Sequence, residues 1–397
     1  MKKFVSILLS LFMMVFLAEA LLSVLDDGLI LALDVHLLSL PRALLAILFF
    51  LAAIVIYLLM AFTPMIPKRW FVPATLFIPA GMLAMIPVSI YAYNRLLAAS
   101  LALSFIQLIL ALWILYRAQG RLSLRWPLVP NEKIDERSFS WRNLAGFIAA
   151  NLFLLAPLTL AYLAFCLSLA ANHFSAGFLR LRPSGVILQA RSYTRADGRA
   201  IELIPMMHIG KSDFYSEVTK SFPSNSIALL EGVSDEKHLL EHKLSYKRLA
   251  DSLGLAEQHK GFMPPQASSR PADVDIDQFS KTTIELLNLV TQLYSEGLDS
   301  NLLIKMLAKS SDPKIGAQLW DDLLAKRNEH LLHEIHIELA RTNTIVVPWG
   351  AMHMPGLAAE IEKFGFHVSK TRDFEAMSFR SILKPKLSRK DSGMFSK

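Results

Sequence analysis

Two histidines and one glutamate in the C-terminal half of the chain each stand at the end of an apolar run, next to a glycine-bearing turn. They are His208 after the run 200–207, Glu231 after the run 226–230, and His353 after the run 344–347. Two imidazoles and a carboxylate form the ligand set of many hydrolytic metal sites, where the metal acidifies a bound water and polarises a carbonyl. The residues alone leave a second interpretation open, in which these side chains only cap turns or lie on the surface.

The stretch around His353 reads Trp349-Gly350-Ala351-Met352-His353-Met354-Pro355-Gly356. An apolar run that breaks at a glycine exposes the following histidine at the mouth of a sheet. Pro355 and Gly356 then open a periodic segment that favours a helix. Because strand ends on one edge of a sheet gather side chains distant in sequence, we expect the two histidines and Glu231 to share one cleft.

Three aspartates, Asp273, Asp275 and Asp277, alternate along a short acidic stretch. Carboxylate oxygens suit Mn²⁺, Ca²⁺ or Mg²⁺, so Asp273 and Asp275 are possible additional ligands. The alternative is a solvated segment before a helix, with Asp277 as its cap.

Other patterns predict no further chemistry. The run His333-Glu334-Ile335-His336 is one residue short of the His-Glu-x-x-His zinc motif, so we interpret these histidines as part of a polar helix face. Cys166 is the one cysteine, which excludes disulfides and cysteine metal sites from the C-terminal part. No Gly-x-Ser-x-Gly, phosphate-loop or dinucleotide motif occurs.

The elements that must position these residues alternate between strands and helices. A hairpin is predicted for 187–192 and 200–207 around the turn 195–198, and a short strand for 226–230. Helical patterns follow at about 236–253, 282–307 and 315–341, and after a strand ending before Gly350 come a helix and a last strand at 366–369. This order favours an α/β or α+β domain.

The first 170 or so residues have a membrane composition. Four segments are apolar over the roughly 20 residues that a bilayer crossing needs: 42–63, 71–93, 96–116 and 144–170. The run 4–17 after Lys2 and Lys3 is either a further, uncleaved crossing or a signal peptide ending near Ala18-Glu19-Ala20. We favour the crossing. The membrane domain at 1–172 is therefore predicted to have four or five transmembrane helices, five if this run is a crossing and four if it is a signal peptide.

The distribution of basic residues sets the expected orientation. Within the first 172 residues, Lys2, Lys3, the turn with Lys68 and Arg69, and the loop 117–142 hold most of the basic residues, whereas the connection with Asp26 and Asp27 is acidic. By the positive-inside rule the basic connections are cytoplasmic, so the domain 173–384 is predicted to be extracytoplasmic, followed by a basic tail at 385–397. The net charge of +7 follows from this rule, and we predict no nucleic-acid partner.

At residues 185–372 the sequence resembles the TraB/GumN/Tiki family, whose members have two Gly-x-x-His motifs with a glutamate between them. The stretch Gly350 to Gly356 with Gly365 and Phe366 downstream matches the second motif, and Glu231 fits the family glutamate. Ala272 to Asp275 and Arg327-Asn328 also correspond to family positions. The first motif differs from the family pattern, because Pro205-Met206-Met207-His208 has a proline where the family has a glycine.

The resemblance implies an α/β Tiki/TraB-like domain behind a multi-pass helical membrane segment, and a metal-dependent hydrolase. His208, Glu231 and His353 would surround a divalent ion such as Mn, Co or Zn. Glu231 would ligate the metal or act as general base, and Arg327 would be an electrostatic partner for that carboxylate or for a developing oxyanion.

Three functions follow as hypotheses. The first is a membrane-anchored metallopeptidase acting on extracytoplasmic peptides or proteins. The second is a protein that binds peptides or other ligands without turnover, its site being vestigial, which the proline of the first motif favours. The third, transport, is weaker, because Glu19 is the one ionisable residue expected at mid-bilayer depth.

Overall fold

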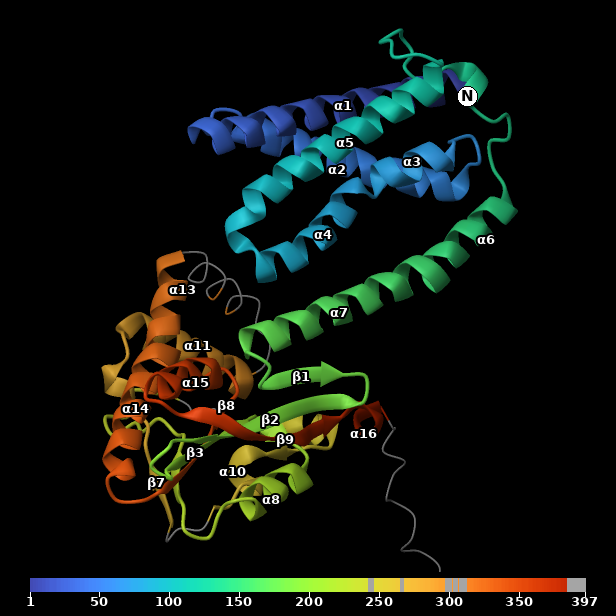
Figure 1. Cartoon of the computed structure of the whole chain (residues 1–397). Helices are drawn as coiled ribbons and strands as arrows, with labels where there is room; N and C mark the ends of the chain where they lie inside the picture. The colour runs from blue at the N-terminus through green and yellow to red at the C-terminus, as the bar shows by residue number, and fades with distance from the viewer. Residues whose placement is uncertain (242–245, 265–267, 297–301, 303–305, 307–312, 384–397) are drawn as a thin grey trace, which may run out of the picture. The chain divides into compact units, whose positions relative to one another are not determined.

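The computed structural model describes residues 1–397 except 242–245, 265–267, 297–301, 303–305, 307–312 and 384–397. The predicted basic tail and the end of the predicted helix 282–307 therefore lie almost entirely outside the described residues. The chain divides into two compact units, Met1–Leu169 and Ala170–Lys397 (Figure 1).

The first unit is helical. Its main elements are α1 (Lys2–Leu33), α2 (Ser39–Phe62), α3 (Lys68–Thr75), α4 (Phe77–Tyr91), α5 (Leu96–Gln119), α6 (Trp141–Ala150) and the first part of α7 (Ala156–Phe174), with a π-helical turn at Asn151–Leu155 between the last two. Among the described residues, four helices are long and apolar enough to cross a membrane, and there are five if α3 and α4 form one span. The prediction of an apolar helical N-terminal region is confirmed, and the length and composition of these helices suit a membrane.

The predicted crossing 71–93 is not one straight helix. It is divided into α3 and α4, which meet at a bend of 49° near Leu76. Pro79 explains the position of the bend, because its ring excludes the carbonyl of the residue four positions earlier, Thr75, and provides no N–H to bond it.

Asp26 and Asp27 do not lie in a connection between helices, which is where the sequence predicts them. Both lie inside α1 with almost fully buried side chains, and Arg42 of α2 forms ion pairs with both. Ser104 of α5 donates a hydrogen bond to Asp27 over 2.8 Å. A helix buried in apolar surroundings holds two carboxylates only if they are paired, so this cluster joins α1, α2 and α5 through compensated charge.

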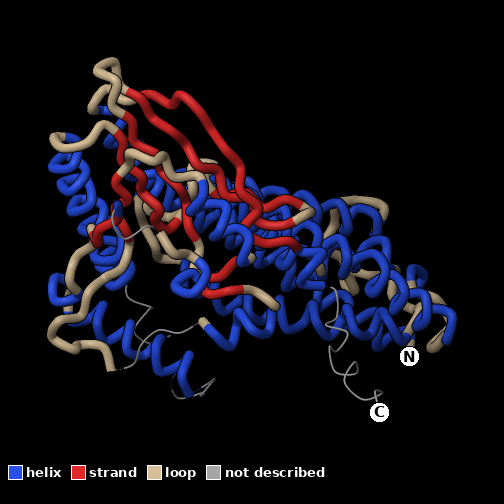
Figure 2. The backbone as a smooth tube through the Cα atoms, turned by 90° about the horizontal axis from the view of Figure 1, so that it is seen from below, coloured by secondary structure: helices blue, strands red, loops and turns tan. Residues whose placement is uncertain are grey.

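The second unit contains one large mixed sheet. Among the described residues its strands are ordered β1 (Leu179–Arg182), β2 (Gly185–Thr194), β3 (Ala200–Met206), β8 (Thr344–Gly350), β5 (Ile227–Leu230) and β7 (Ser269–Pro271), and β9 (His367–Ser378) pairs with β2. The strands β3, β8, β5 and β7 are mutually parallel, whereas β1, β2 and β9 are antiparallel to their partners. Figure 2 shows these strands running beside one another.

Helices cover both faces of this sheet, which makes three layers. Alternation along β8 sends Ile345, Val347 and Trp349 into a core shared with α14 (Lys326–Leu339) and α15 (Met354–Lys363), and Val346 into a core shared with α8 (Ser212–Lys220). This is the period-2 pattern of a strand buried on both sides. The α/β fold class is confirmed in kind, and nothing in the architecture identifies the TraB family.

The predicted elements agree with the structure where the pattern is strong. The hairpin β2–β3, the strands β5 and β8 and the helix α15 are confirmed. The predicted helix 315–341 corresponds to a continuous helical run with similar bounds, made of α13 (Pro313–Trp320), a π-helical turn and α14. The predicted helix 282–307 corresponds to α11 (Lys281–Glu296) as far as Glu296.

Other predictions were incomplete. Only α9 (Lys247–Leu253) is helical among the described residues of 236–253, and β9 extends nine residues beyond Ser369 because it follows the long strand β2. No sequence pattern predicted α8, β1 or β7, nor the small elements β4 (Ile209–Gly210), β6 (Ala256–Glu257), α10 (Gln258–Gly261) and α16 (Phe379–Leu383).

The buried charge cluster gives a first testable prediction. Arg42→Ala leaves Asp26 and Asp27 without a cation, and we expect a loss of stability on the order of 3 kcal/mol, measured as a lower melting temperature of the full chain in detergent. Arg95→Ala, at an exposed arginine of the same unit, is the control. Adding Asp26→Asn and Asp27→Asn to the Arg42 variant should recover most of the loss, and an unaltered melting temperature of the single variant would contradict this role.

Candidate functional site

The parallel strands deliver the predicted residues to one edge of the sheet. Met206 at the end of β3 is paired with Gly350 at the end of β8, and Leu230 at the end of β5 is paired with Pro271 of β7. The chain leaves this edge toward His208, Glu231, Asp273 and His353. The expected convergence at the carboxyl ends of the strands therefore holds for the backbone.

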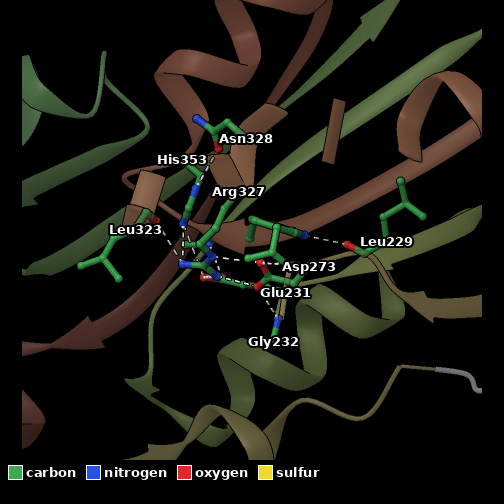
Figure 3. Close-up of polar contacts among 11 residues, drawn as sticks. Leu229, Glu231, Gly232, Asp273, Leu323, Arg327, Asn328 and His353 are labelled. Atoms are coloured by element: carbon green, nitrogen blue, oxygen red, sulfur yellow. Dashed lines mark hydrogen bonds and ion pairs between the residues drawn. The ribbon is translucent and has the colours of Figure 1, made fainter. Parts of the chain in front are cut away.

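Arg327 is the centre of the side-chain contacts at this edge (Figure 3). It projects from the first turn of α14, and its guanidinium has five N–H groups. All five are used: Nε and Nη2 donate to Asp273 over 3.0 and 2.6 Å, Nη2 to Glu231 over 2.9 Å, and Nη1 lies 3.3 Å from the Leu323 carbonyl and 3.1 Å from His353 Nε2. No N–H remains free for another ligand in this arrangement.

The charges explain why this arginine tolerates burial. Burial opposes its charge, but the hydrogen bonds and negative charges of Asp273 and Glu231 outweigh that effect and raise the pKa of the Arg327 guanidinium. The Asp273 side chain is fully buried, whereas 12% of the Glu231 side chain is exposed. Glu231 is therefore the acidic member of the cluster that solvent and a substrate can reach.

Glu231 is fixed by two different donors. Its Oε1 accepts from Arg327, and its Oε2 accepts from the backbone N–H of Gly350 over 2.6 Å. A Cβ atom at Gly350 would lie 3.4 Å from Oε2, at the near limit of an ordinary van der Waals contact. The glycine of the second motif thus lets the end of β8 approach Glu231 closely.

His353 is held as a neutral imidazole. Its Nδ1 lies 2.8 Å from the Asn328 side-chain oxygen, and its Nε2 faces the Arg327 donor. Since Asn328 Oδ1 and the guanidinium fix both roles, Nδ1 donates and Nε2 accepts. Burial lowers the pKa of the His353 imidazole to about 4, an effect that the nearby Glu231 charge only partly opposes.

The second glycine of the motif has a separate steric role. A Cβ atom at Gly356 would lie 2.7 Å from the Asn328 side-chain nitrogen. Only a residue without a side chain lets the first turn of α15 pack against the amide that orients His353. Trp349 also packs against His353. Its indole N–H donates to the Leu229 carbonyl over 3.0 Å, and its ring contacts the His353 ring edge to face. No sequence pattern predicts that Trp349 or Asn328 contacts His353, although Asn328 follows Arg327 directly.

His208 lies apart from this network in the described residues. Its exposed ring stacks on Tyr246 with centroids 5.0 Å apart, and its carbonyl accepts from Gln258. Pro205, which replaces the glycine of the first motif, lies within β3, two residues beyond the last β2 pair at Leu203. A proline is tolerated there because no ladder bond to β2 is required.

The remaining aspartates and histidines have structural contacts. Asp275 caps the short 3-10 helix Ile276–Gln278, and hydrogen bonds from Asp277 N, Ser234 and Glu236 N lower the pKa of its carboxyl to about 2. Asp275, rather than Asp277, is therefore the cap. The histidines of α14 are on its outer surface, as the polar-face interpretation predicts; His333 and His336 are exposed.

These donors assemble only part of the predicted metal site. Glu231 Oε1 and His353 Nε2 are 3.7 Å apart, and the Nδ1 bond to Asn328 is the outer contact that metal-binding histidines commonly make. Arg327, however, bonds both donor atoms. Among the described residues no group of three His, Cys, Asp or Glu is placed to hold a metal ion. Glu231 and His353 are groups of the kind that bind divalent cations. With Arg327 bonded to both, however, their arrangement does not suit a cation.

The pKa of His353 gives a prediction about pH. The unfolded imidazole takes up a proton near pH 6.5 and the folded one only near 4, so its contribution to stability is complete above 6.5 and is lost as pH falls toward 4. The free energy of unfolding should fall by up to about 1.4 kcal/mol per pH unit in this window. Chemical unfolding at a series of pH values should show that His353→Gln removes this slope and exposed His333→Gln does not. Parallel slopes for all three proteins would refute the assignment.

No protein-family model, no curated protein and no solved structure matches this chain. The TraB/GumN/Tiki relationship therefore stays a prediction based on its motifs.

Proposed function

We propose that the second unit is a hydrolase that acts on peptides or proteins, with Glu231 and His353 at its centre. One observation carries the proposal: an accessible carboxylate and a neutral imidazole lie 3.7 Å apart at the carboxyl edge of a parallel sheet. Fixed donors hold both groups, and pairs of titratable groups in contrasting environments are typical of acid–base sites.

The proposed enzyme is metal-dependent. Glu231 and His353 would hold the divalent ion, with His208 as the predicted third ligand. When bound, the ion would supply an acidified water and polarise the carbonyl of the scissile bond.

The protein groups have separate roles in this proposal. Glu231 is the group that can accept a proton from an incoming water, because it alone combines exposure with a fixed position. Asn328 keeps the His353 proton on Nδ1 and so directs the Nε2 lone pair into the site. Arg327 stabilises the charged form of Glu231. Of the two roles expected for this arginine, its contacts favour that of carboxylate partner over that of oxyanion donor.

A second candidate, ligand binding without turnover, is favoured by a specific observation. The guanidinium of Arg327 has all five N–H groups engaged and covers the donor atoms of Glu231 and His353. A cluster that stays in this form would be a structural centre under a binding surface. The peptide substrate itself comes from the family resemblance.

The proposed location of the site is the extracytoplasmic side of a membrane. Support comes from the helices long and apolar enough to span it and from the basic residues of 117–142, which the positive-inside rule places in the cytoplasm. The bilayer and a peptide are thus the partners that we propose.

The activity prediction tests the centre of the site. Glu231→Gln and His353→Gln should each lower kcat/KM by about 10²- to 10⁴-fold, because each removes an acid–base group while keeping the side-chain volume. The measurement is cleavage of a quenched fluorogenic peptide library by the full chain in detergent with Mn²⁺, Co²⁺ or Zn²⁺. Exposed Glu236→Gln and His333→Gln serve as controls. Peptide binding that persists without any cleavage would instead select the second candidate.

A topology prediction tests the location. A reporter that is active only outside the cytoplasm, fused after Lys397, should be active, because the last span would carry the domain across. The same reporter fused in the loop 117–142 should be inactive. The reverse pattern would overturn the extracytoplasmic placement and leave the chemistry of the site untouched.

A further inference from the structure

We infer that the loop 117–142 of the first unit is a binding surface for anionic phospholipid headgroups, with three apolar side chains inserted among the lipids. This segment, the basic loop, joins α5 to α6 and begins at the end of the unit where the N-terminus lies (Figure 1). The inference rests on the proposed membrane location and is independent of the proposed hydrolase.

The middle of the basic loop is held against the helices. Val129 is fully buried, its carbonyl accepts a hydrogen bond from the Ser6 hydroxyl of α1 over 2.6 Å, and its N–H donates to Ser10 over 3.0 Å. Gln119, at the end of α5, donates to the Arg125 carbonyl over 2.7 Å. Both ends of the turn that follows α5 are therefore fixed, and the side chains along it are presented in a defined way.

This turn exposes three large apolar side chains that are close together in sequence. Leu122, Leu124 and Trp126 alternate along it and are 65, 71 and 55% exposed. The two arginines that flank the leucines, Arg121 and Arg125, are exposed as well. Leucines and an indole beside cationic groups are typical of segments at the boundary of a membrane, where the apolar groups enter the acyl region and the cations meet the headgroups.

The charge of the basic loop indicates an anionic partner. The loop has six basic and three acidic residues. Two of the acids already have a cation, since Glu136 pairs with Lys2 over 2.9 Å and Asp135 with Arg137 over 3.1 Å. Among the described residues, no ion pair involves the other arginines of the loop, which are Arg117, Arg121, Arg125 and Arg142. Guanidinium groups in this state attract the phosphates of anionic lipids over about a Debye length.

The connections at the opposite end of the same unit, 34–38 and 92–95, differ in charge. They also expose large apolar side chains, such as Leu37, but they contain the acid Asp34 and a single arginine, Arg95. Apolar exposure is thus common to both ends, whereas an excess of cations distinguishes the basic loop. The charge therefore favours an anionic lipid over lipids in general as the partner of this loop.

The experiment uses the full chain in phospholipid vesicles and the fluorescence of Trp126, taken as the difference between the native chain and Trp126→Phe. Equal fractions of phosphatidylglycerol or phosphatidylcholine with brominated acyl chains, which quench a nearby indole, are compared. The ratio of phosphatidylglycerol to phosphatidylcholine around Trp126 should exceed the bulk ratio at least about fivefold, as expected for one arginine near an anionic surface. Half-molar KCl should bring this local ratio toward the bulk value by screening the charges.

Matched variants separate the charge from the apolar contact. Arg121→Gln combined with Arg125→Gln should bring the local ratio toward the bulk value, while both lipids still quench Trp126. Arg121→Lys combined with Arg125→Lys should keep the preference, because an ammonium also attracts phosphate. Exposed Arg95→Gln, at the opposite end of the unit, is the control and should leave the ratio unchanged.

The other outcomes contradict the inference in distinguishable ways. Equal quenching by the two lipids overturns it and leaves the membrane location intact. Quenching of Trp126 by aqueous iodide and by neither lipid also overturns it, and would assign the basic loop to a soluble acidic partner. A preference that persists in the double glutamine variant overturns the role of Arg121 and Arg125. A chain that alkaline carbonate removes from the vesicles overturns the membrane location itself, and the inference with it.

Discussion

The bonds of one buried guanidinium hold together the edge of the sheet on which the proposed chemistry depends. Arg327 comes from α14, whereas its partners follow three different strands: Glu231 after β5, Asp273 after β7 and His353 after β8. A planar group with five donors can satisfy such divergent acceptors at once, which a lysine ammonium cannot do. The positions of Glu231, Asp273 and His353 are thus tied to one side chain.

The helical first unit follows the same rule in different surroundings. Asp26 and Asp27 lie in α1 among apolar residues, and Arg42 supplies the compensating charge from the next helix. In both units a single arginine faces two carboxylates, because one positive charge and several N–H donors offset most of the cost of removing acids from water. The presence of these acids within α1 also weakens the composition argument against transport, which rested on Glu19 alone.

Much of this arrangement follows from sequence, and the remainder depends on contacts that no local pattern encodes. Alternating apolar runs predicted β3, β5 and β8, and parallel pairing then brought their ends together. The pattern could not show which side chains meet, since rotamers decide that Asp273 faces Arg327 while Asp275 turns back to cap a helix. No pattern predicted the strand β7, because it is three residues long and lies in a Pro- and Ser-rich stretch.

The stretches around His353 and His208 differ in how they position the histidine side chain. Around His353, glycines at 350 and 356 admit Glu231 and Asn328 to close range, and the imidazole is locked. Around His208 the glycine is replaced by Pro205, and the ring lies exposed against Tyr246. Turning an exposed ring sacrifices one stacking contact, on the order of 1 kcal/mol. The backbone of β3 ends at the same edge as β8, but the His208 side chain makes none of the contacts of the Arg327 cluster among the described residues. The two histidines therefore differ in how they are held, because both ring nitrogens of His353 have partners whereas the His208 ring is held by a stacking contact.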